Sequence, residues 1–271
     1  MKALQIQSNG MGQQSAALYL MSCLGIFPRL DYSIMADTGA EKEGTYKYAT
    51  NLVDWIKRNN GVKLIIDQSK NLYDDIMNNE GGRMASLPLF TSNGGKIIRQ
   101  CTYEYKIEII NKVIRELQAK KKGQSFDPVN VWFGISFDEI HRMNPPSRKN
   151  VTHVYPFTGY QMTDKKVSKI DWGKQMTRSQ INKWMIEKGF EIPPKSSCIF
   201  CPFMKNTEWL SMKIETPKDF QKAVRIDHKI RNKAKLDNQN FIHRSLKPLE
   251  EVRFNQDQLE IEYDCMGYCG I

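Results

Sequence analysis

The sequence predicts an α/β fold in which crossover helices join the strands of a parallel sheet. Over about the first 70 residues, β-rich and helical segments alternate in the order β-α-β-α-β, which is the pattern of such sheets. Hydrophobic residues make up 40% of the 271-residue chain, enough for a packed core. The length suits one principal domain with a smaller appendage. We therefore expect a domain at residues 1–145 and a basic, cysteine-rich region at 146–271.

The first elements follow from the local pattern of apolar residues. Residues 3–7 form a short apolar run typical of a strand. Residues 15–25 have the composition of a helix that ends at Gly25. Further along the chain we expect a strand at 31–39, a helix at 44–60 and a strand at 62–67.

A long, loop-rich connection spans residues 68–100, and connections of this length in a compact domain are often functional. Apolar residues at helical spacing then predict a helix at 102–119, with Thr102 as the candidate N-cap. A strand of the buried type is expected at 129–136. The composition changes near residue 145, and beyond it the chain is basic and irregular, with helices expected at 178–189 and 216–235.

The composition also excludes some classes of protein. No stretch approaches about 18 consecutive apolar residues, which excludes a transmembrane helix. The N-terminus lacks the apolar region of a secretory signal, so we expect a cytoplasmic protein with no membrane partner. The net charge of +10 favours an anionic substrate or a polyanionic partner, although a solvated basic surface would give the same value.

Basic and aromatic residues interleave between positions 153 and 185. This arrangement suits a nucleic-acid strand, because bases stack on aromatic rings while cations neutralise the phosphates. Aromatic side chains at such positions more often belong to a packed core or to packing between domains. Nucleic acid is therefore one candidate partner, and core packing is the alternative.

The segment from Ser8 to Ser15 joins a predicted strand to a predicted helix and contains Gly10 and Gly12. Glycines let backbone N–H groups approach an anion, and the helix N-terminus adds partial positive charge. These features are typical of a phosphate site, although an ordinary glycine-containing turn would look the same. The segment is neither a Walker loop nor a dinucleotide fingerprint. Asp37 ends the next strand at the same sheet edge, where it could contact a ribose, orient a metal or cap a helix.

Charged residues accompany a thiol in two further segments. Arg99 and Lys106 flank Cys101, where they could grip a phosphate and lower the pKa of the thiol. The alternative is that Arg99 pairs with a carboxylate and that the thiol is inert. Asp138 and Arg142 follow a buried strand, a placement that suits magnesium binding or substrate positioning.

The remaining cysteines suggest metal or thiol chemistry, since a cytosolic disulfide framework is rare. Cys198 and Cys201 form a CxxC pair, and Cys265 and Cys269 form a CxxxC pair at the end of the chain. Four thiolates suit zinc and an iron–sulfur cluster equally well, and free or redox-paired thiols are the alternative. Cys23 lies in an apolar helical stretch and is expected to be plain core.

Five motifs follow one another in a recognisable order: SNGMGQQS, MADTGAE, RQCTYEYKI, WFGISFDEIHR and PPKSSCIFCPF. Together they resemble the phosphoadenosine phosphosulfate (PAPS) reductase family of the adenine-nucleotide α-hydrolase-like, or PP-loop, enzymes. The resemblance is greatest to phage and bacterial members related to DNA-phosphorothioation sulfurtransferases, and it covers nearly the whole chain. It implies a Rossmann-like sheet with helices on both faces that binds ATP or another adenylyl nucleotide.

The resemblance also implies roles for individual residues. It places Ser8, Gly10, Gly12, Gln14 and Ser15 at the phosphates, Met35, Ala36 and Asp37 at the adenine and ribose, and Gly134 and Ile135 beside the nucleotide. The candidate catalytic residues are Arg99, Cys101, Lys106, Asp138 and Arg142. Two positions depart from the usual loop, because Met11 replaces a glycine and Gln14 replaces an aspartate that could contact magnesium. The chain also lacks the Glu-Cys-Gly-Leu-His tail of true PAPS reductases, which argues against simple sulfonucleotide reduction.

The implied reaction is cleavage of ATP at the α-phosphate to adenylate an acceptor, followed by sulfur transfer to a nucleic acid or nucleotide. The implied cofactors are Mg²⁺ and a [4Fe–4S] cluster on Cys198, Cys201, Cys265 and Cys269, with zinc as the alternative metal. A sulfur-donor protein and a second copy of the chain are further candidate partners. Two other functions remain open: thiol-dependent reduction of a sulfonucleotide, and nucleotide binding by a catalytically silent regulatory protein.

Overall fold

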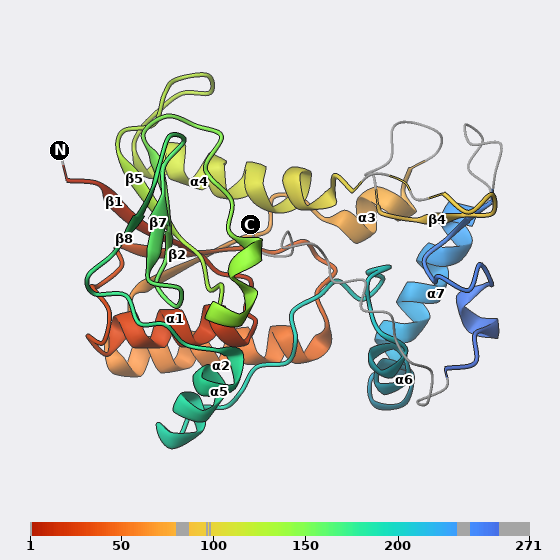
Figure 1. Cartoon of the computed structure of the whole chain (residues 1–271). Coiled ribbons are helices and arrows are strands. Elements are labelled where there is room, and N and C mark those ends of the chain that lie inside the picture. Colours follow the sequence, from red (N-terminus) through yellow and green to blue (C-terminus); the bar gives the residue numbers. More distant parts are fainter. Residues whose placement is uncertain (1, 80–86, 96, 98, 232–238, 255–271) are drawn as a thin grey trace.

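The computed structural model describes residues 2–79, 87–95, 97, 99–231 and 239–254 (Figure 1). Its main feature is a seven-stranded sheet with the strand order β3-β2-β1-β5-β6-β7-β8. The strands are β1 (Leu4–Ser8), β2 (Tyr32–Ala36), β3 (Lys63–Asp67), β5 (Val129–Trp132), β6 (Val151–Tyr155), β7 (Tyr160–Met162) and β8 (Val167–Lys169). All pairs from β3 to β6 are parallel, and β7 and β8 are antiparallel additions. The predicted α/β class and parallel sheet are confirmed.

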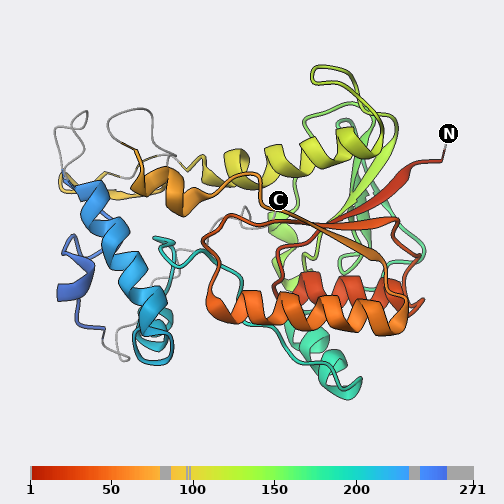
Figure 2. The same ribbon diagram turned by 180° about the vertical axis from the view of Figure 1, so that it is seen from behind.

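Helices cover both faces of this sheet, as the two opposite views show (Figures 1 and 2). The helices on one face are α1 (Gln13–Cys23), α2 (Glu43–Asn59) and α5 (Arg178–Glu187), and the helix on the other is α4 (Glu108–Leu117). The alternation of side chains along β5 explains the two layers: Val131 packs in the α4 cluster, and Trp132 packs in the α1 cluster.

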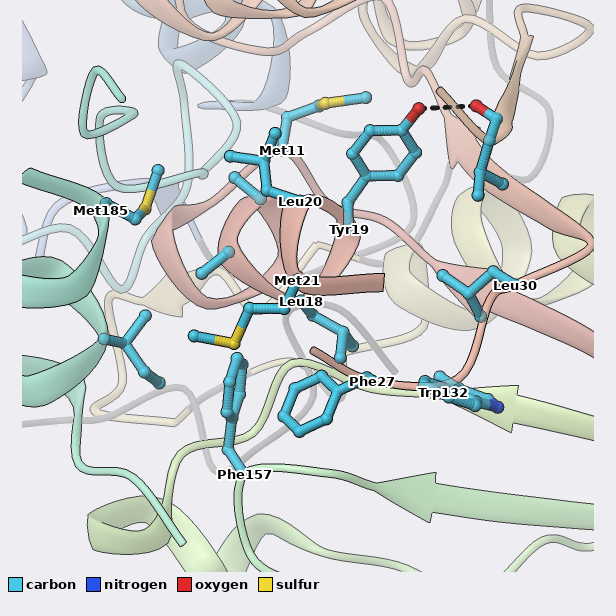
Figure 3. Packing of buried hydrophobic residues seen from close by; sticks show 14 of the residues in the cluster. Met11, Leu18, Tyr19, Leu20, Met21, Phe27, Leu30, Trp132, Phe157 and Met185 are labelled. Carbon is cyan, nitrogen blue, oxygen red and sulfur yellow. Dashed lines mark hydrogen bonds between the residues drawn. The ribbon is translucent and has the colours of Figure 1, made fainter. Parts of the chain in front are cut away.

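Helix α1 lies at the centre of the layer that α1, α2 and α5 form on one face of the sheet (Figure 3). Every residue from Ala16 to Ser22 is buried, as expected for a helix that is apolar on all sides. The Tyr19 hydroxyl donates a hydrogen bond of 2.6 Å to the Val62 carbonyl, which satisfies the one polar atom of this side chain. Cys23, predicted as core, is partly buried and packs against this cluster, and its sulfur accepts a contact of 3.3 Å from the Val62 amide.

The strands that follow β1 in the chain are added first on one side of β1 and later on its other side. From β1 it passes through α1 to β2 and then to β3, whereas β5 pairs with the opposite side of β1. The loops after β1 and β5 therefore part at a topological switch point, the usual ligand site of such sheets. At Gly134 the β5 loop touches the first turn of α1 so closely that an added Cβ would lie 2.7 Å from the Gln14 carbonyl carbon and the Ser15 amide nitrogen.

A second group of elements packs around its own hydrophobic cluster, at the end of the molecule away from β7 and β8 (Figures 1 and 2). Its helices are α3 (Leu72–Met77), α6 (Asn206–Glu215) and α7 (Pro217–Arg231), joined by the short strands β4 (Phe90–Thr91) and β9 (Asn240–Phe241) and the turn η3 (Leu249–Glu251). The fully buried carboxylate of Asp227 accepts hydrogen bonds from the amides of Ile242 (3.1 Å) and Leu249 (3.0 Å) and pairs with Arg231. This carboxylate holds the segment after β9 against α7.

Several elements differ from the sequence prediction. Strands β6 to β8, after residue 145, were not predicted and pair with the sheet of the N-terminal segment. Helices α3 and α6 were also missed, whereas α5 and α7 were predicted. The N-cap prediction for Thr102 is wrong, because this residue is helical (φ −63°, ψ −43°) and its side chain makes no capping hydrogen bond. The helix there contains a π-helical turn, η1 (Tyr103–Ile107), and η2 (Phe137–Arg142) is a 3₁₀ turn.

Replacing Gly134 with alanine should destabilise the protein by about 1–3 kcal/mol, because the new methyl group would force the backbone of the β5 loop away from α1. Urea denaturation monitored by circular dichroism measures this change. Gly10→Ala is the matched control, since a Cβ there would lie 3.8 Å from its nearest neighbour, the Ser196 Oγ. Equal free energies of unfolding for the two variants would show that the close contact at Gly134 does not matter.

Candidate functional site

The loop between β1 and α1 has a fixed shape at the carboxyl edge of the sheet. The buried Asn9 side chain donates to the Ser33 hydroxyl (3.1 Å) and accepts from the Met11 amide (2.9 Å). Met11 has a φ of 55°, a left-handed conformation that favours glycine. Its side chain is fully buried in the α1 cluster. Burial of the methionine therefore compensates for the unfavourable backbone at this position.

The side chain of Gln14 is bound to another side chain of the protein, so binding phosphate is not its only role. It donates a hydrogen bond of 2.8 Å to Glu139, whose carboxylate also accepts from Arg142 (2.8 Å) and Arg178. Glu139 thus ties the start of α1 to η2 and to the start of α5. An aspartate at position 14 would place a second negative charge beside Glu139, which explains why glutamine suits this chain.

The two candidate catalytic residues after β5 belong to the same network. Arg142 pairs with Glu139, and Asp138 accepts a hydrogen bond of 3.0 Å from the Arg178 amide at the start of α5. Burial alone would raise the pKa of Asp138, but hydrogen bonds from Ser136 and from this amide outweigh it and lower the pKa. Neither candidate lines the pockets described below.

Asp37 is buried, and both of its carboxylate oxygens are engaged. One oxygen accepts from the Gly39 amide (2.9 Å) and the Tyr46 hydroxyl (2.8 Å), and the other accepts from Gln68 (2.9 Å). Burial, followed by the bond to Asp37, raises the pKa of Tyr46, so this hydroxyl remains a donor. Asp37 does not cap α2, whose N-cap is Lys42. Its carboxylate instead shapes the turn that follows β2.

A small crevice of about 10 Å³ lies between the carboxyl ends of β1 and β2. Four of the residues expected at the nucleotide line it: Ser8, Gly10, Met35 and Ala36. Its other lining residues are Asn9, Glu41, Lys106 and Ile110. Lys106 reaches it from η1 and pairs with the Glu41 Oε1 at 3.1 Å. Glu41 was not singled out from the sequence, where GAEKEG reads as an ordinary charged loop.

A second pocket, of about 40 Å³, brings three cysteines together with two cations. Its lining residues are Thr38, Leu72, Leu87, Pro88, Arg99, Cys101, Thr102, Lys106, Ser196, Ser197, Cys198, Phe200, Cys201 and Pro202. We call this the thiol pocket. Lys106 lines both the thiol pocket and the crevice, so the two sites are neighbours. A Cβ on Gly12 would lie 3.4 Å from the Cβ of Ser196, which shows that the segment leading to the CxxC pair covers the glycine loop.

Cys198 is held close to the crevice. Its backbone forms an isolated β-bridge with Glu41, and its sulfur lies 3.8 Å from the Thr38 hydroxyl. Burial raises the pKa of the Cys198 thiol, the negative charge of Glu41 adds to this rise, and Lys106 partly opposes it. The free thiol is therefore protonated at neutral pH, and a bound metal or a change in charge would be needed to generate the thiolate.

The predicted metal site has four cysteines, and two of them, Cys265 and Cys269, lie outside the described residues. Among residues 2–79, 87–95, 97, 99–231 and 239–254, no group of three His, Cys, Asp or Glu side chains is arranged to hold a metal. Cys198 and Cys201 are joined by a tight turn with a backbone hydrogen bond of 3.1 Å. This pair would supply two ligands of the predicted set.

The aromatic residues between 153 and 185 pack largely inside the protein. Tyr155 and Phe157 are fully buried, and Trp172 stacks on Trp132 with ring centroids 4.6 Å apart. For these rings the structure supports packing rather than base stacking. Lys165 and Lys166 are exposed in the β7–β8 turn. No described helix is long and apolar enough to cross a membrane.

Comparison of the chain with protein-family models, with curated proteins and with solved structures found no match. The features that bear on function are therefore the crevice, the glycine loop and the thiol pocket.

Replacing Asp37 with asparagine should destabilise the protein by about 1–3 kcal/mol, because the amide NH₂ would face a donor in either orientation. Chemical denaturation measures the change. The control is Asp54→Asn, at a 58% exposed side chain of α2, which should change the free energy of unfolding by less than about 0.5 kcal/mol. If Asp37→Asn were as stable as this control, the carboxylate would not be shaping the turn after β2.

Proposed function

We propose that the protein is an ATP-using enzyme of the PAPS-reductase-like type, which adenylates an acceptor and prepares it for sulfur transfer. One observation carries this proposal: Lys106 lines both the crevice beside the glycine loop and the thiol pocket. A nucleotide at the switch point would thus lie next to cysteine side chains. This juxtaposition is what a reaction that uses both a nucleotide and sulfur requires.

The glycine loop is the proposed phosphate site. The first amides of a helix have no partner within it, and the helix dipole adds partial positive charge at the same end. Gly12 is the N-cap of α1, in extended backbone, and makes no side-chain capping bond. An anion at this end of α1 would satisfy the free amides. No acidic residue lies in the first turn of α1 to compete with it.

In the proposed reaction, an oxygen of the acceptor attacks the α-phosphorus of ATP. A new P–O bond forms, the bond between the α-phosphorus and the bridging oxygen breaks, and pyrophosphate leaves towards the glycine loop. A sulfur nucleophile then attacks the activated centre of the acceptor, and AMP departs with the original oxygen. We assign the sulfur to the outer atom of a persulfide on a donor protein, so its attack leaves the acceptor joined to the donor by a disulfide. An external dithiol then reduces this S–S bond, is itself oxidised to a disulfide, and releases the thiolated acceptor and the donor thiol. Arg99 and Lys106 would neutralise charge that develops on the phosphates.

The residues present are compatible with a metal but do not complete its site. Cys198 and Cys201 would hold two positions, and Cys265 and Cys269, outside the described residues, would hold the others. An iron–sulfur cluster would supply electron or sulfur chemistry beside the nucleotide, and zinc would supply structural stability. Mg²⁺ would arrive bound to the ATP phosphates, as is usual for this ion.

Reduction of a sulfonucleotide is the second candidate function, because the thiol pocket places Cys101 beside the CxxC pair. The two reactions differ in their products: adenylation releases pyrophosphate from ATP, and reduction releases sulfite from a sulfonucleotide when thiols are oxidised. Product analysis with each nucleotide therefore separates them.

The purified protein should bind ATP in isothermal titration calorimetry and release pyrophosphate when Mg²⁺ and the acceptor are present. Gly10→Glu should weaken ATP binding at least about tenfold, because a carboxylate in the loop repels the phosphates. Thr50→Glu is the control, because it adds the same charge at an exposed position of α2 that lines neither pocket, and it should bind ATP as the wild type does. A wild-type protein that does not bind ATP would overturn the proposal, whereas binding without pyrophosphate release would favour the silent regulatory alternative.

Anaerobically purified protein should contain iron or zinc, and a broad visible absorption band would identify an iron–sulfur cluster. Cys198→Ser should lose the metal, because it removes one thiolate ligand. Cys23→Ser is the matched control, since Cys23 lies in the α1 core and should leave the metal content unchanged. Metal content that is the same in Cys198→Ser and in the wild type would remove Cys198 from the ligand set.

A further inference from the structure

Glu41 is the one residue of the crevice whose side chain is buried, charged and only half satisfied among the described residues. It is 4% exposed. Its Oε1 pairs with Lys106 at 3.1 Å, and its Oε2 is buried with no hydrogen-bond partner among those residues. A buried acceptor without a donor costs about 1–3 kcal/mol, and more when it carries a charge. Such an atom points to a ligand that supplies the donor.

The surroundings of Glu41 favour a neutral donor over a cation. The Lys106 ammonium group already neutralises this carboxylate and would repel a divalent ion beside it. No second carboxylate of the described part of the chain lines the crevice, whose other walls are small, amide or apolar residues. A hydroxyl or an amino group of a ligand satisfies the oxygen without adding charge.

The size and the position of the crevice favour a hydroxyl over an amino group as the donor from the ligand. The crevice of about 10 Å³ is near the lower limit for one water-sized group, so it admits a hydroxyl but not a purine ring. Gly10 of the glycine loop forms part of its wall. The ribose is the part of a nucleotide next to the phosphates, so a ribose hydroxyl reaches this position when the phosphates occupy the loop.

We propose that Glu41 is a specificity-determining residue that accepts a hydrogen bond from a ribose hydroxyl of the adenylyl nucleotide. This inference rests on the proposed function, since it assumes phosphates at the glycine loop. Asp37, which the sequence favoured for the ribose, has both oxygens engaged by Gly39, Tyr46 and Gln68. Glu41 is therefore the better acceptor at this edge of the sheet.

The proposal predicts discrimination between ribonucleotides and their deoxy analogues. Loss of a hydrogen bond to a buried charged group weakens binding by about tenfold or more. We therefore expect either 2′-deoxy-ATP or 3′-deoxy-ATP to bind the full-length wild-type protein at least about tenfold more weakly than ATP does. A phosphate in place of that hydroxyl would be too large for the crevice and would face a carboxylate, so it should bind more weakly still.

The experiment is isothermal titration calorimetry of ATP, the two deoxy analogues and purine-riboside triphosphate, which lacks the amino group of adenine. Glu41→Gln should reduce the discrimination against the deoxy analogue, because the amide is an uncharged acceptor. Glu43→Gln, at an exposed position that lines neither pocket, is the control and should keep the wild-type ratio. The wild-type ligand series decides the question even if Glu41→Gln does not fold.

The outcomes separate this inference from the proposed function. Equal binding of ATP and both deoxy analogues to the wild type overturns the ribose contact while nucleotide binding stands. Discrimination only against purine-riboside triphosphate, lost in Glu41→Gln, assigns Glu41 to the base and also overturns it. A protein that binds none of the four nucleotides overturns the proposed function, and the role of Glu41 fails with it.

Discussion

The close contact between Gly134 and the first turn of α1 is the constraint on which the candidate site depends. It sets the β5 loop against the backbone of Gln14 and Ser15 with no room for a side chain. Because β1 and β5 are neighbours in the sheet, this contact fixes both loops at one point of its carboxyl edge. The position of the helix N-terminus, and with it any anion held there, follows from this packing rather than from the loop sequence alone.

The Glu41–Lys106 ion pair is the second interaction that shapes the candidate site. The two side chains are only 2% and 15% exposed, so removing them from water is costly and the pair is weak evidence for stability. It joins the segment after β2 to the π-helical turn η1, and the same segment bridges to Cys198. Turns of this kind are common at functional sites. A costly pair that links the crevice to the thiol pocket is easier to explain by function than by folding.

Much of the fold was accessible from the sequence because its signals are local. The apolar runs of β1 to β3 and the periodicity of α2 predicted those elements within a few residues. Strands β7 and β8 have three residues each and α3 has six, which is too short for periodicity to show. Glu41 was not assigned a role because its partner, Lys106, is distant in sequence. Only the folded chain reveals that this carboxylate and this ammonium group are buried together.

Met11 and Gln14, the two departures from the loop of the family that the sequence resembles, each have an explanation in the packing of this chain. Met11 adopts the left-handed backbone that a glycine would adopt and fills the core with its side chain, so the loop path is retained. Gln14 is uncharged, unlike the aspartate of that family, and donates a hydrogen bond to Glu139. The charge of Glu139 is in turn neutralised by two arginines. The first turn of α1 therefore carries no negative charge, and its attraction for phosphate increases. The nearest carboxylate to this turn, that of Glu139, is already paired with Arg142 and Arg178 rather than left free for a metal.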